Sequence, residues 1–242
     1  MKKAILVVSF GTSYHETRKK TIEACENKIK ESFKDYDFYR AFTSGMIINK
    51  LKKRDNMFID NPSEALEKLY NAGYKEVVVQ SLHIICGDEY NKLKDMVAQY
   101  EDKFDKISIG RPLLTYIDDY RETVEAVKKD LDKMDIDEAV VFMGHGTEHE
   151  SHSSYPAIEY MFRDYGINAF VGTVEGYPEL EQVIKKLKNR NSERNIGLSA
   201  IILSIQGILK RNLNLLESSH FIFGRDDIFY KLVLIGRKLA LK

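Results

Sequence analysis

The chain has 242 residues, of which 43% are hydrophobic and 31% charged, so it can form one large domain or two small ones with real cores. Its 37 basic and 37 acidic residues cancel, which argues against nucleic acid or an anionic membrane as a partner. Two cysteines, Cys25 and Cys86, are too few for a disulfide framework and fit a reducing cytoplasm. The first apolar run, residues 4–10, is too short for a membrane span and predicts a strand.

The first half alternates short β-branched runs with longer stretches of helical period. This alternation predicts βαβ units and therefore a doubly wound parallel sheet. The predicted strands are 4–10, 38–44, 76–85 and 106–114, and the predicted helices are 16–33, 63–73 and 88–104.

The second half repeats the first. Residues 138–150 (EAVVFMGHGTEHE) have the form of residues 4–16 (AILVVSFGTSYHE): an apolar strand, then Gly and Thr, then a histidine. An internal duplication accounts for this better than convergence, and it predicts two similar α/β lobes, 1–115 and 135–242, joined by a helix over 116–134. The other corresponding segments are 37–47 with 167–178, 75–87 with 195–207, and 104–114 with 230–240.

Loops that follow the strands are the expected ligand-binding positions, because open parallel sheets bind ligands at the carboxyl ends of their strands. We expect these loops from both lobes to face one cleft. They are residues 11–15, 43–45, 83–90, 144–152 and 174–177.

His145 stands out because it follows an apolar strand and lies between Gly144 and Gly146. The glycines permit unusual backbone angles and would leave space for a ligand. A histidine here can bind a divalent metal or exchange a proton near neutral pH, or it can be a strand-end residue bonded to its own turn. His149 and His152 lie at helical spacing from His145, but the intervening glycine predicts a loop, so the three side chains need not converge.

Two acidic residues and one histidine complete the candidate set. Glu175 follows a strand of the second lobe and is either a metal ligand or a solvated loop acid. Glu89 and His83 lie after a strand of the first lobe, where Glu89 can also serve the start of a helix. Asp88 is assigned to that helix start, and Cys86 to a small buried residue.

Other reaction signatures are missing from the sequence. It has no Gly-x-x-x-x-Gly-Lys phosphate loop, no Gly-x-Ser-x-Gly elbow and no His-Glu-x-x-His motif. The residues alone therefore predict a two-lobed α/β protein that handles a divalent metal, a proton-transfer substrate, or both.

Three separated stretches, VVFMGHGTEH, SLHIICGDEY and FVGTVEGYP, resemble the class II chelatases. Within them the chain is most similar to the anaerobic cobaltochelatases, cytoplasmic lyases that insert Co2+ into the tetrapyrrole sirohydrochlorin for cobalamin biosynthesis. The resemblance covers about residues 1–195. It implies two α/β lobes with the tetrapyrrole between them, Co2+ as a substrate ion and no organic cofactor, and it leaves a homo-oligomer open.

The resemblance also implies roles for single residues. His145 would be metal ligand and base for the pyrrole N–H protons, Glu175 a second ligand, and Glu89 an acid that assists metal delivery or proton removal. The carboxylates of sirohydrochlorin would need backbone N–H groups and cations. The residues expected to contact the substrate are Gly11, Thr12, Ser13, His83, Arg111, Gly144 and Gly146.

One expected residue is missing. The family carries a further metal-binding histidine in a Gly-Asp-His stretch after the third strand of the second lobe, and residues 204–220 here read SIQGILKRNLNLLESSH. A frameshift or a divergent branch with a two-ligand site would explain this. The alternatives to cobalt insertion are Fe2+ insertion into a related ring and an inactive tetrapyrrole- or metal-binding relative. Residues 201–205 and 231–236 still have strand character and are predicted to complete the sheet.

Overall fold

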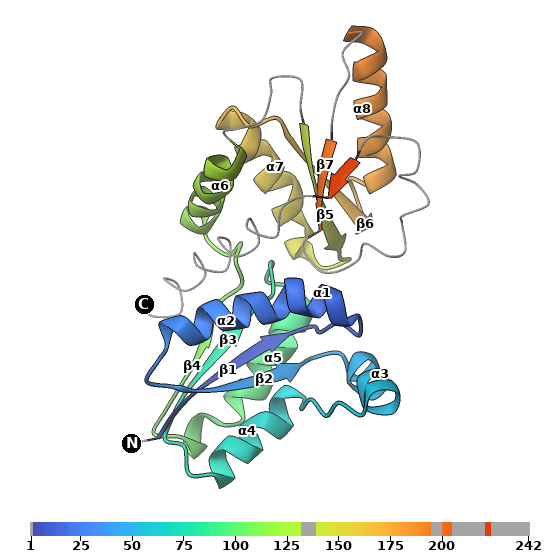
Figure 1. Cartoon of the computed structure of the whole chain (residues 1–242). Helices are drawn as coiled ribbons and strands as arrows, with labels where there is room; N and C mark the ends of the chain where they lie inside the picture. Colours follow the sequence, from blue (N-terminus) through green and yellow to red (C-terminus); the bar gives the residue numbers. More distant parts are fainter. Residues whose placement is uncertain (1, 132–138, 195–199, 205–220, 224–242) are drawn as a thin grey trace. The chain divides into compact units, whose positions relative to one another are not determined.

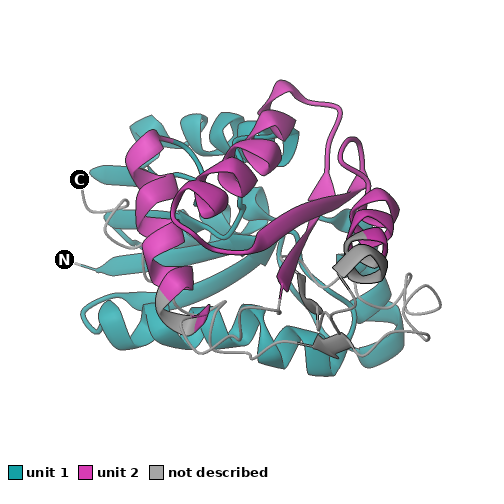
Figure 2. Cartoon of the chain, turned by 90° about the horizontal axis from the view of Figure 1, so that it is seen from above, with its two compact units in different colours: residues 1–115, 229–242 teal, residues 116–228 magenta. Residues whose placement is uncertain are grey.

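The computed structural model describes residues 2–131, 139–194, 200–204 and 221–223. The described residues up to Thr115 form one compact unit, and those from Tyr116 on form a second, coloured separately in Figure 2. Each unit is built around a parallel sheet with helices on its faces (Figure 1). No helix in the described part of the chain has the length and apolar character needed to cross a membrane.

The sheet of the first unit has the strand order β2-β1-β3-β4, with every neighbouring pair parallel. Its strands are β1 (Lys3–Ser9), β2 (Asp37–Phe42), β3 (Glu76–Ser81) and β4 (Lys106–Gly110). Its helices are α1 (His15–Lys20), α2 (Ile22–Ser32), α3 (Gly45–Asp55), α4 (Pro62–Asn71), α5 (Asp88–Ala98) and the 3-10 helix η1 (Glu101–Lys103).

The core of this unit follows from the alternation of side chains along β1. Leu6 and Val8 pack with Leu66 of α4 and Leu93 of α5 on one face. Ile5 and Val7 pack on the other face with residues of α2. Since both faces are covered, the strand is apolar almost throughout, and each fully buried aliphatic side chain contributes about 1.5–3 kcal/mol.

Helix boundaries agree with the sequence in part. Helix α4 begins at a capping box made by Asn61 and Glu64, and the predicted terminal glycine, Gly73, has φ +78°. The helix predicted over 16–33 is two helices, because the chain turns at Thr21, whose hydroxyl donates to the Thr17 carbonyl oxygen at 2.7 Å. Helix α3 was not predicted.

The sheet of the second unit has the order β6-β5-β7-β8 among the described residues, again all parallel. Its strands are β5 (Ala139–Gly146), β6 (Ala169–Glu175), β7 (Ala200–Ser204) and β8 (Phe221–Phe223). Its helices are α6 (Ile117–Leu131), the 3-10 helix η2 (Glu150–Ser153), α7 (Ser154–Asp164) and α8 (Leu180–Arg194).

Apolar side chains pack on both faces of this second sheet. Val141 and Met143 pack with Val183 and other apolar residues of α8 on one face. On the opposite face Phe142 stacks on Phe162 of α7, with ring centroids 4.9 Å apart. Helix α6, predicted as a connecting segment, packs against α7.

The two sheets have the same connectivity, since β5, β6 and β7 take the positions of β1, β2 and β3. The prediction of two similar parallel α/β lobes is therefore confirmed. The fourth position is filled by β8 at Phe221–Phe223, whereas the sequence predicted residues 230–240 there. Residues 230–240 lie outside the described residues.

Candidate metal and substrate site

His145 and Glu175 meet at the carboxyl edge of the second sheet. They come from the adjacent strands β5 and β6, whose register places Gly146 opposite Glu175. The Nδ1 atom of His145 lies 3.7 Å from Oε2 of Glu175. The two side chains are 46% and 63% exposed, and the same Nδ1 also lies 3.3 Å from the Gly146 carbonyl oxygen, so His145 contacts its own turn as well.

The separation of these two atoms suits a shared divalent ion better than a direct bond. A distance of 3.7 Å is too long for a hydrogen bond. Two ligand atoms that each lie about 2.1 Å from one ion are about 3.4 Å apart at a tetrahedral angle. A small side-chain movement would bring the imidazole and the carboxylate to that spacing, and this ligand pair suits borderline divalent metals.

The flanking glycines have packing roles. Gly146 has φ +85°, and a Cβ there would lie 1.6 Å from the Glu175 carbonyl oxygen. A Cβ on Gly144 would lie 2.3 Å from the Tyr155 ring. The space beside these glycines is therefore occupied by the protein itself and is not left open for a ligand as the sequence suggested.

The three neighbouring histidines have three separate environments. The Nδ1 atom of His149 accepts a hydrogen bond from Ser151 N–H at 3.1 Å, so this side chain caps η2. The His152 ring lies between two loops: Nδ1 accepts from Thr147 N–H at 3.2 Å, and Nε2 lies 2.6 Å from the Tyr177 carbonyl oxygen. In the part of the chain that the structure describes, neither ring forms a hydrogen bond with His145.

Tyr155, through its ring, and Tyr177, through its carbonyl oxygen, also contact His152, and the sequence analysis assigned neither of them a role. The Tyr155 ring meets the edge of the His152 ring at 5.3 Å. Burial raises the pKa of the Tyr155 hydroxyl, and a hydrogen bond with the Gly146 backbone partly offsets that rise. Tyr177 lies in the FVGTVEGYP stretch and in a loop expected to bind ligand, but nothing in the sequence connects either tyrosine with the histidines.

In the first unit, His83 is buried just after β3. Its Nδ1 lies 2.8 Å from Ser81 Oγ, and its Nε2 has no hydrogen-bond partner within the described residues. Burial lowers the pKa of His83 to about 4, although the charge of Glu89 acts in the opposite direction. This imidazole is therefore neutral at neutral pH.

Glu89 lies in the first turn of α5 and is partly exposed. Its carboxylate accepts a hydrogen bond from Lys92 Nζ at 3.2 Å, which is an i,i+3 pair on the helix. Its position fits both predicted uses, the helix start and a reachable acid at the sheet edge. Asp88 is the exposed first residue of α5, and Cys86 Sγ lies 3.3 Å from Thr115 Oγ1.

The residues after β1 form a tight turn. Gly11 has φ +92°, and Thr12 and Ser13 are only 8% and 6% exposed. Thr12 Oγ1 accepts from Tyr14 N–H at 3.3 Å. The Thr12 hydroxyl thus serves the turn, and a substrate would meet it only after some rearrangement. Arg111 is half-buried directly after β4.

No group of three or more His, Cys, Asp or Glu side chains that could hold a metal exists among the residues that the structure describes. The described ligand candidates are therefore the pair His145 and Glu175. The stretch in which the family resemblance implies a further histidine falls on residues 205–220, which lie outside the described residues.

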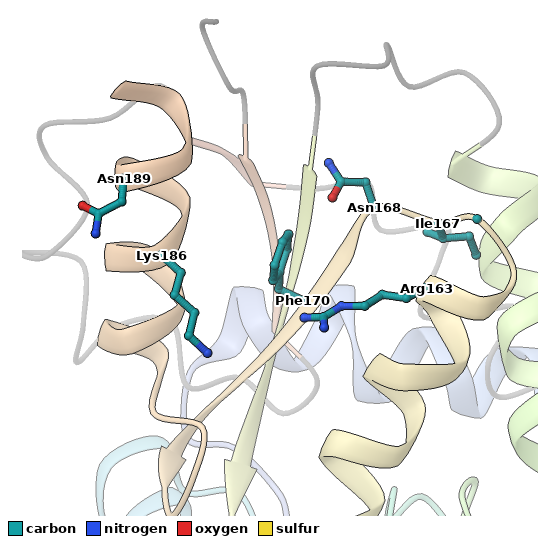
Figure 3. A pocket seen from close by; sticks show the side chains of 7 residues that line it. Arg163, Ile167, Asn168, Phe170, Lys186 and Asn189 are labelled. Atoms are coloured by element: carbon teal, nitrogen blue, oxygen red, sulfur yellow. The ribbon is translucent and has the colours of Figure 1, made fainter. Parts of the chain in front are cut away.

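A cavity of about 650 Å³ lies at the other end of the second sheet, where β6 begins (Figure 3). The Arg163 guanidinium lies over the Phe170 ring at 5.3 Å and pairs with Glu159. The cavity borders the amino end of β6, whereas Glu175 is at its carboxyl end, so it is separate from the metal pair. It is lined by Arg163, Gly166, Ile167, Asn168, Phe170, Lys186 and Asn189.

Two solved structures share this fold. SirB from Bacillus subtilis with Fe3+ has a TM-score of 0.64 at 15% identity, covering 99% of this chain and 96% of that one. SirB from Bacillus subtilis subspecies spizizenii in complex with cobalt has a TM-score of 0.63 at 13% identity, with 100% and 96% covered. At these identities the likeness defines the class of fold, a two-sheet chelatase fold.

Sequence comparison gives the family. The cobalt chelatase (CbiK) family matches residues 3–205. The sirohydrochlorin cobaltochelatase of Salmonella typhimurium is 46% identical over 189 residues, which are 78% of this chain and 72% of that protein. Sirohydrochlorin cobaltochelatase CbiKC of Nitratidesulfovibrio vulgaris is 34% identical over 197 residues, 77% of this chain and 67% of that protein. The chain belongs to the cobalt chelatase family, as the sequence motifs predicted.

Proposed function

We propose that this chain inserts Co2+ into sirohydrochlorin. The observation that carries the proposal is the pairing of His145 with Glu175 at one sheet edge, 3.7 Å apart and accessible, in a member of the cobalt chelatase family. The relatives named above are sirohydrochlorin cobaltochelatases, which supports the same metal and the same tetrapyrrole here.

Metal insertion requires a group that binds a divalent ion and a group that accepts protons. Insertion strips water from the ion, removes two protons from the macrocycle and transfers the ion to four ring nitrogens. His145 and Glu175 would hold Co2+ weakly enough to release it, and His145 would accept a pyrrole proton. Glu89 would assist metal delivery or accept a proton.

Other residues would bind the substrate. Sirohydrochlorin carries many carboxylates, which backbone N–H groups of the glycine turns and the guanidinium of Arg111 can bind. Gly11, Thr12, Ser13, His83, Gly144 and Gly146 stay as predicted substrate contacts. The reaction would take place in the cytoplasm, consistent with Cys25 and Cys86 both being free thiols.

The test is the metal-dependent loss of the absorbance of free sirohydrochlorin with purified protein. We expect Co2+ to convert the substrate with the parent chain and conversion to be at least 100-fold slower with His145→Ala. Equal rates for the two proteins would contradict the assignment of His145. An anaerobic Fe2+ arm distinguishes the alternative metal, because a histidine and a carboxylate do not discriminate sharply between Co2+ and Fe2+.

The non-catalytic alternative predicts a different result. A carrier or inactive relative would bind sirohydrochlorin or Co2+ but leave the free-base absorbance unchanged over many hours. The observation behind this alternative is that the described residues supply two candidate ligands and no group of three.

A further inference from the structure

We propose that His152 is a positioning residue for the metal pair. It would link the loop after His145 to the loop after Glu175 and thereby fix the spacing of the two ligands. This inference rests on the proposed function, since it concerns the same pair.

The two nitrogens of the His152 ring bind one loop each. Nδ1 accepts from Thr147 N–H at 3.2 Å, and Nε2 lies 2.6 Å from the Tyr177 carbonyl oxygen. Thr147 is two residues beyond His145, and Tyr177 is two residues beyond Glu175. The imidazole therefore joins the two ligand-bearing segments at matching places.

The hydrogen bonds define the state of the ring. An amide N–H can only donate, so Nδ1 must accept from Thr147; a carbonyl oxygen can only accept, so Nε2 must carry the hydrogen that binds Tyr177. The bridge requires the neutral Nε2–H tautomer. Both nitrogens are then occupied, which makes His152 a poor metal ligand in this conformation despite its place near the site.

Packing holds the ring in the bridge. A Cβ on Gly176 would lie 2.5 Å from Cε1 of His152, so the ring occupies the space that a larger residue would fill. Tyr155 of α7 meets the ring edge at 5.3 Å and an interplanar angle of 62°. His152 thus contacts the end of β6 through Gly176 and the start of α7 through Tyr155.

Such a link matters because the two candidate ligands are exposed, and the hydrogen-bonding contact of the His145 Nδ1 is with its own turn, at 3.3 Å from the Gly146 carbonyl oxygen. His145 and Glu175 are 46% and 63% exposed and have no direct hydrogen bond to each other. Metal sites require ligand distances to be right within about 0.2 Å, and groups that orient ligands from outside typically change metal affinity 10–100-fold when removed. The backbone pairing of Gly146 with Glu175 fixes the strand ends, and His152 fixes the loops beyond them.

The test uses two substitutions that separate hydrogen bonding from packing. His152→Phe keeps a ring against Gly176 and Tyr155 but has no nitrogen. His152→Gln keeps an acceptor and a donor for Thr147 and Tyr177. His149→Ala is the matched control, because its ring nitrogen serves Ser151 within its own loop.

The affinity for Co2+ is measured by calorimetry in the absence of tetrapyrrole. The KM for Co2+ and kcat are measured in the insertion reaction with sirohydrochlorin. We expect His152→Phe to raise both the Kd and the KM for Co2+ about 10-fold with kcat within about twofold. His152→Gln should stay within about threefold of the parent, and His149→Ala should match it. Thermal unfolding shows whether each variant keeps its structure. If His152→Phe does not fold stably, His152→Gln alone tests the proposal. A 10-fold weaker binding of Co2+ by a stably folded His152→Gln contradicts it.

A parallel His145→Ala sample distinguishes failure of the positioning role from failure of the proposed function. If His145→Ala loses Co2+ binding and a folded His152→Phe keeps the parent Kd, the positioning role is wrong and the proposed function stands. If His145→Ala keeps the parent Kd for Co2+, the metal pair itself is wrong and the positioning role falls with it.

Discussion

The ends of β1 and β5 are built on the same turn but present different chemistry. At each strand end an exposed residue is followed by a glycine at positive φ and a threonine. Thr12 Oγ1 accepts from Tyr14 N–H at 3.3 Å, and Thr147 Oγ1 accepts from His149 N–H at 3.1 Å. The residue before the glycine is Phe10 in the first unit and His145 in the second.

The strands beside β1 and β5 also differ at corresponding positions. Ser9 pairs with Phe42, and Gly144 pairs with Thr173, so Ser44 takes the place of Glu175 two residues further on. Ser44 caps α3 by accepting from Ile47 N–H, whereas Glu175 faces His145. The same strand-end positions thus carry a helix cap in the first unit and the candidate metal pair in the second.

The largest expected effect is on the rate of cobalt insertion, when His145 is replaced by phenylalanine, the residue at the corresponding position of the first unit. His145→Phe removes the ligand and the base while keeping the turn, so cobalt insertion should fall about 1000-fold. The rate of sirohydrochlorin absorbance loss measures it. Adding Phe10→His to this variant should restore nothing, because Ser44 offers no carboxylate; recovery of activity in the double variant would refute the comparison.

The two glycines should respond unequally to alanine. At Gly146 the new Cβ would lie 1.6 Å from a backbone oxygen of β6, which can move only if the strands separate. At Gly11 the nearest atoms, at 2.5 Å, belong to the Phe42 side chain, which can shift. We expect Gly146→Ala to lower the free energy of unfolding by about 4 kcal/mol and Gly11→Ala by about 2 kcal/mol.

Urea unfolding midpoints of the two variants give these values. Equal losses would mean that the left-handed backbone angle, which both positions share, and not the clash with β6, determines the cost.

Two imidazoles differ in burial: His83 in the first unit is buried, and His145 in the second unit is exposed. Since the pKa of His83 is lowered to about 4, the unfolded chain binds a proton below pH 6.5 that the folded chain does not. The stability that the neutral His83 provides is complete above pH 6.5 and should decline by about 3 kcal/mol as the pH falls to 4.

His83→Asn should remove this part of the pH dependence. Urea unfolding of parent and variant at pH 7 and pH 4.5 measures it, and the two proteins should differ in their loss on acidification. Identical losses would show that His83 is accessible to protons in the folded chain.

The smallest expected effect is at the shared threonines. Thr12→Val and Thr147→Val each remove one side-chain hydrogen bond to the backbone, so each should lower the free energy of unfolding by about 1 kcal/mol. Urea unfolding checks the values. A clearly larger loss at one position would show that the two turns are less alike than their hydrogen bonds indicate.

The sequence by itself determined the architecture and the positions of the two proposed metal ligands. Apolar periodicity and the repeated Gly-Thr turns predicted two parallel sheets, because the hydrophobicity of each residue and its turn preference can be read locally along the chain. Placing His145 and Glu175 at the ends of neighbouring strands follows from the same pattern, since parallel strands end at one edge. The motifs of the family gave the metal and the ring.

Only the tertiary structure decided what surrounds that pair. The link from His152 to Tyr177 spans 25 residues, and no period or motif connects them. Tyr155 against Gly144 and the burial of Thr12 likewise depend on how helices and loops settle on the sheet. Contacts of this kind depend on packing between segments far apart in the chain. For this reason the three histidines of GHGTEHESH cannot be told apart in the sequence, whereas in the fold each has a different environment.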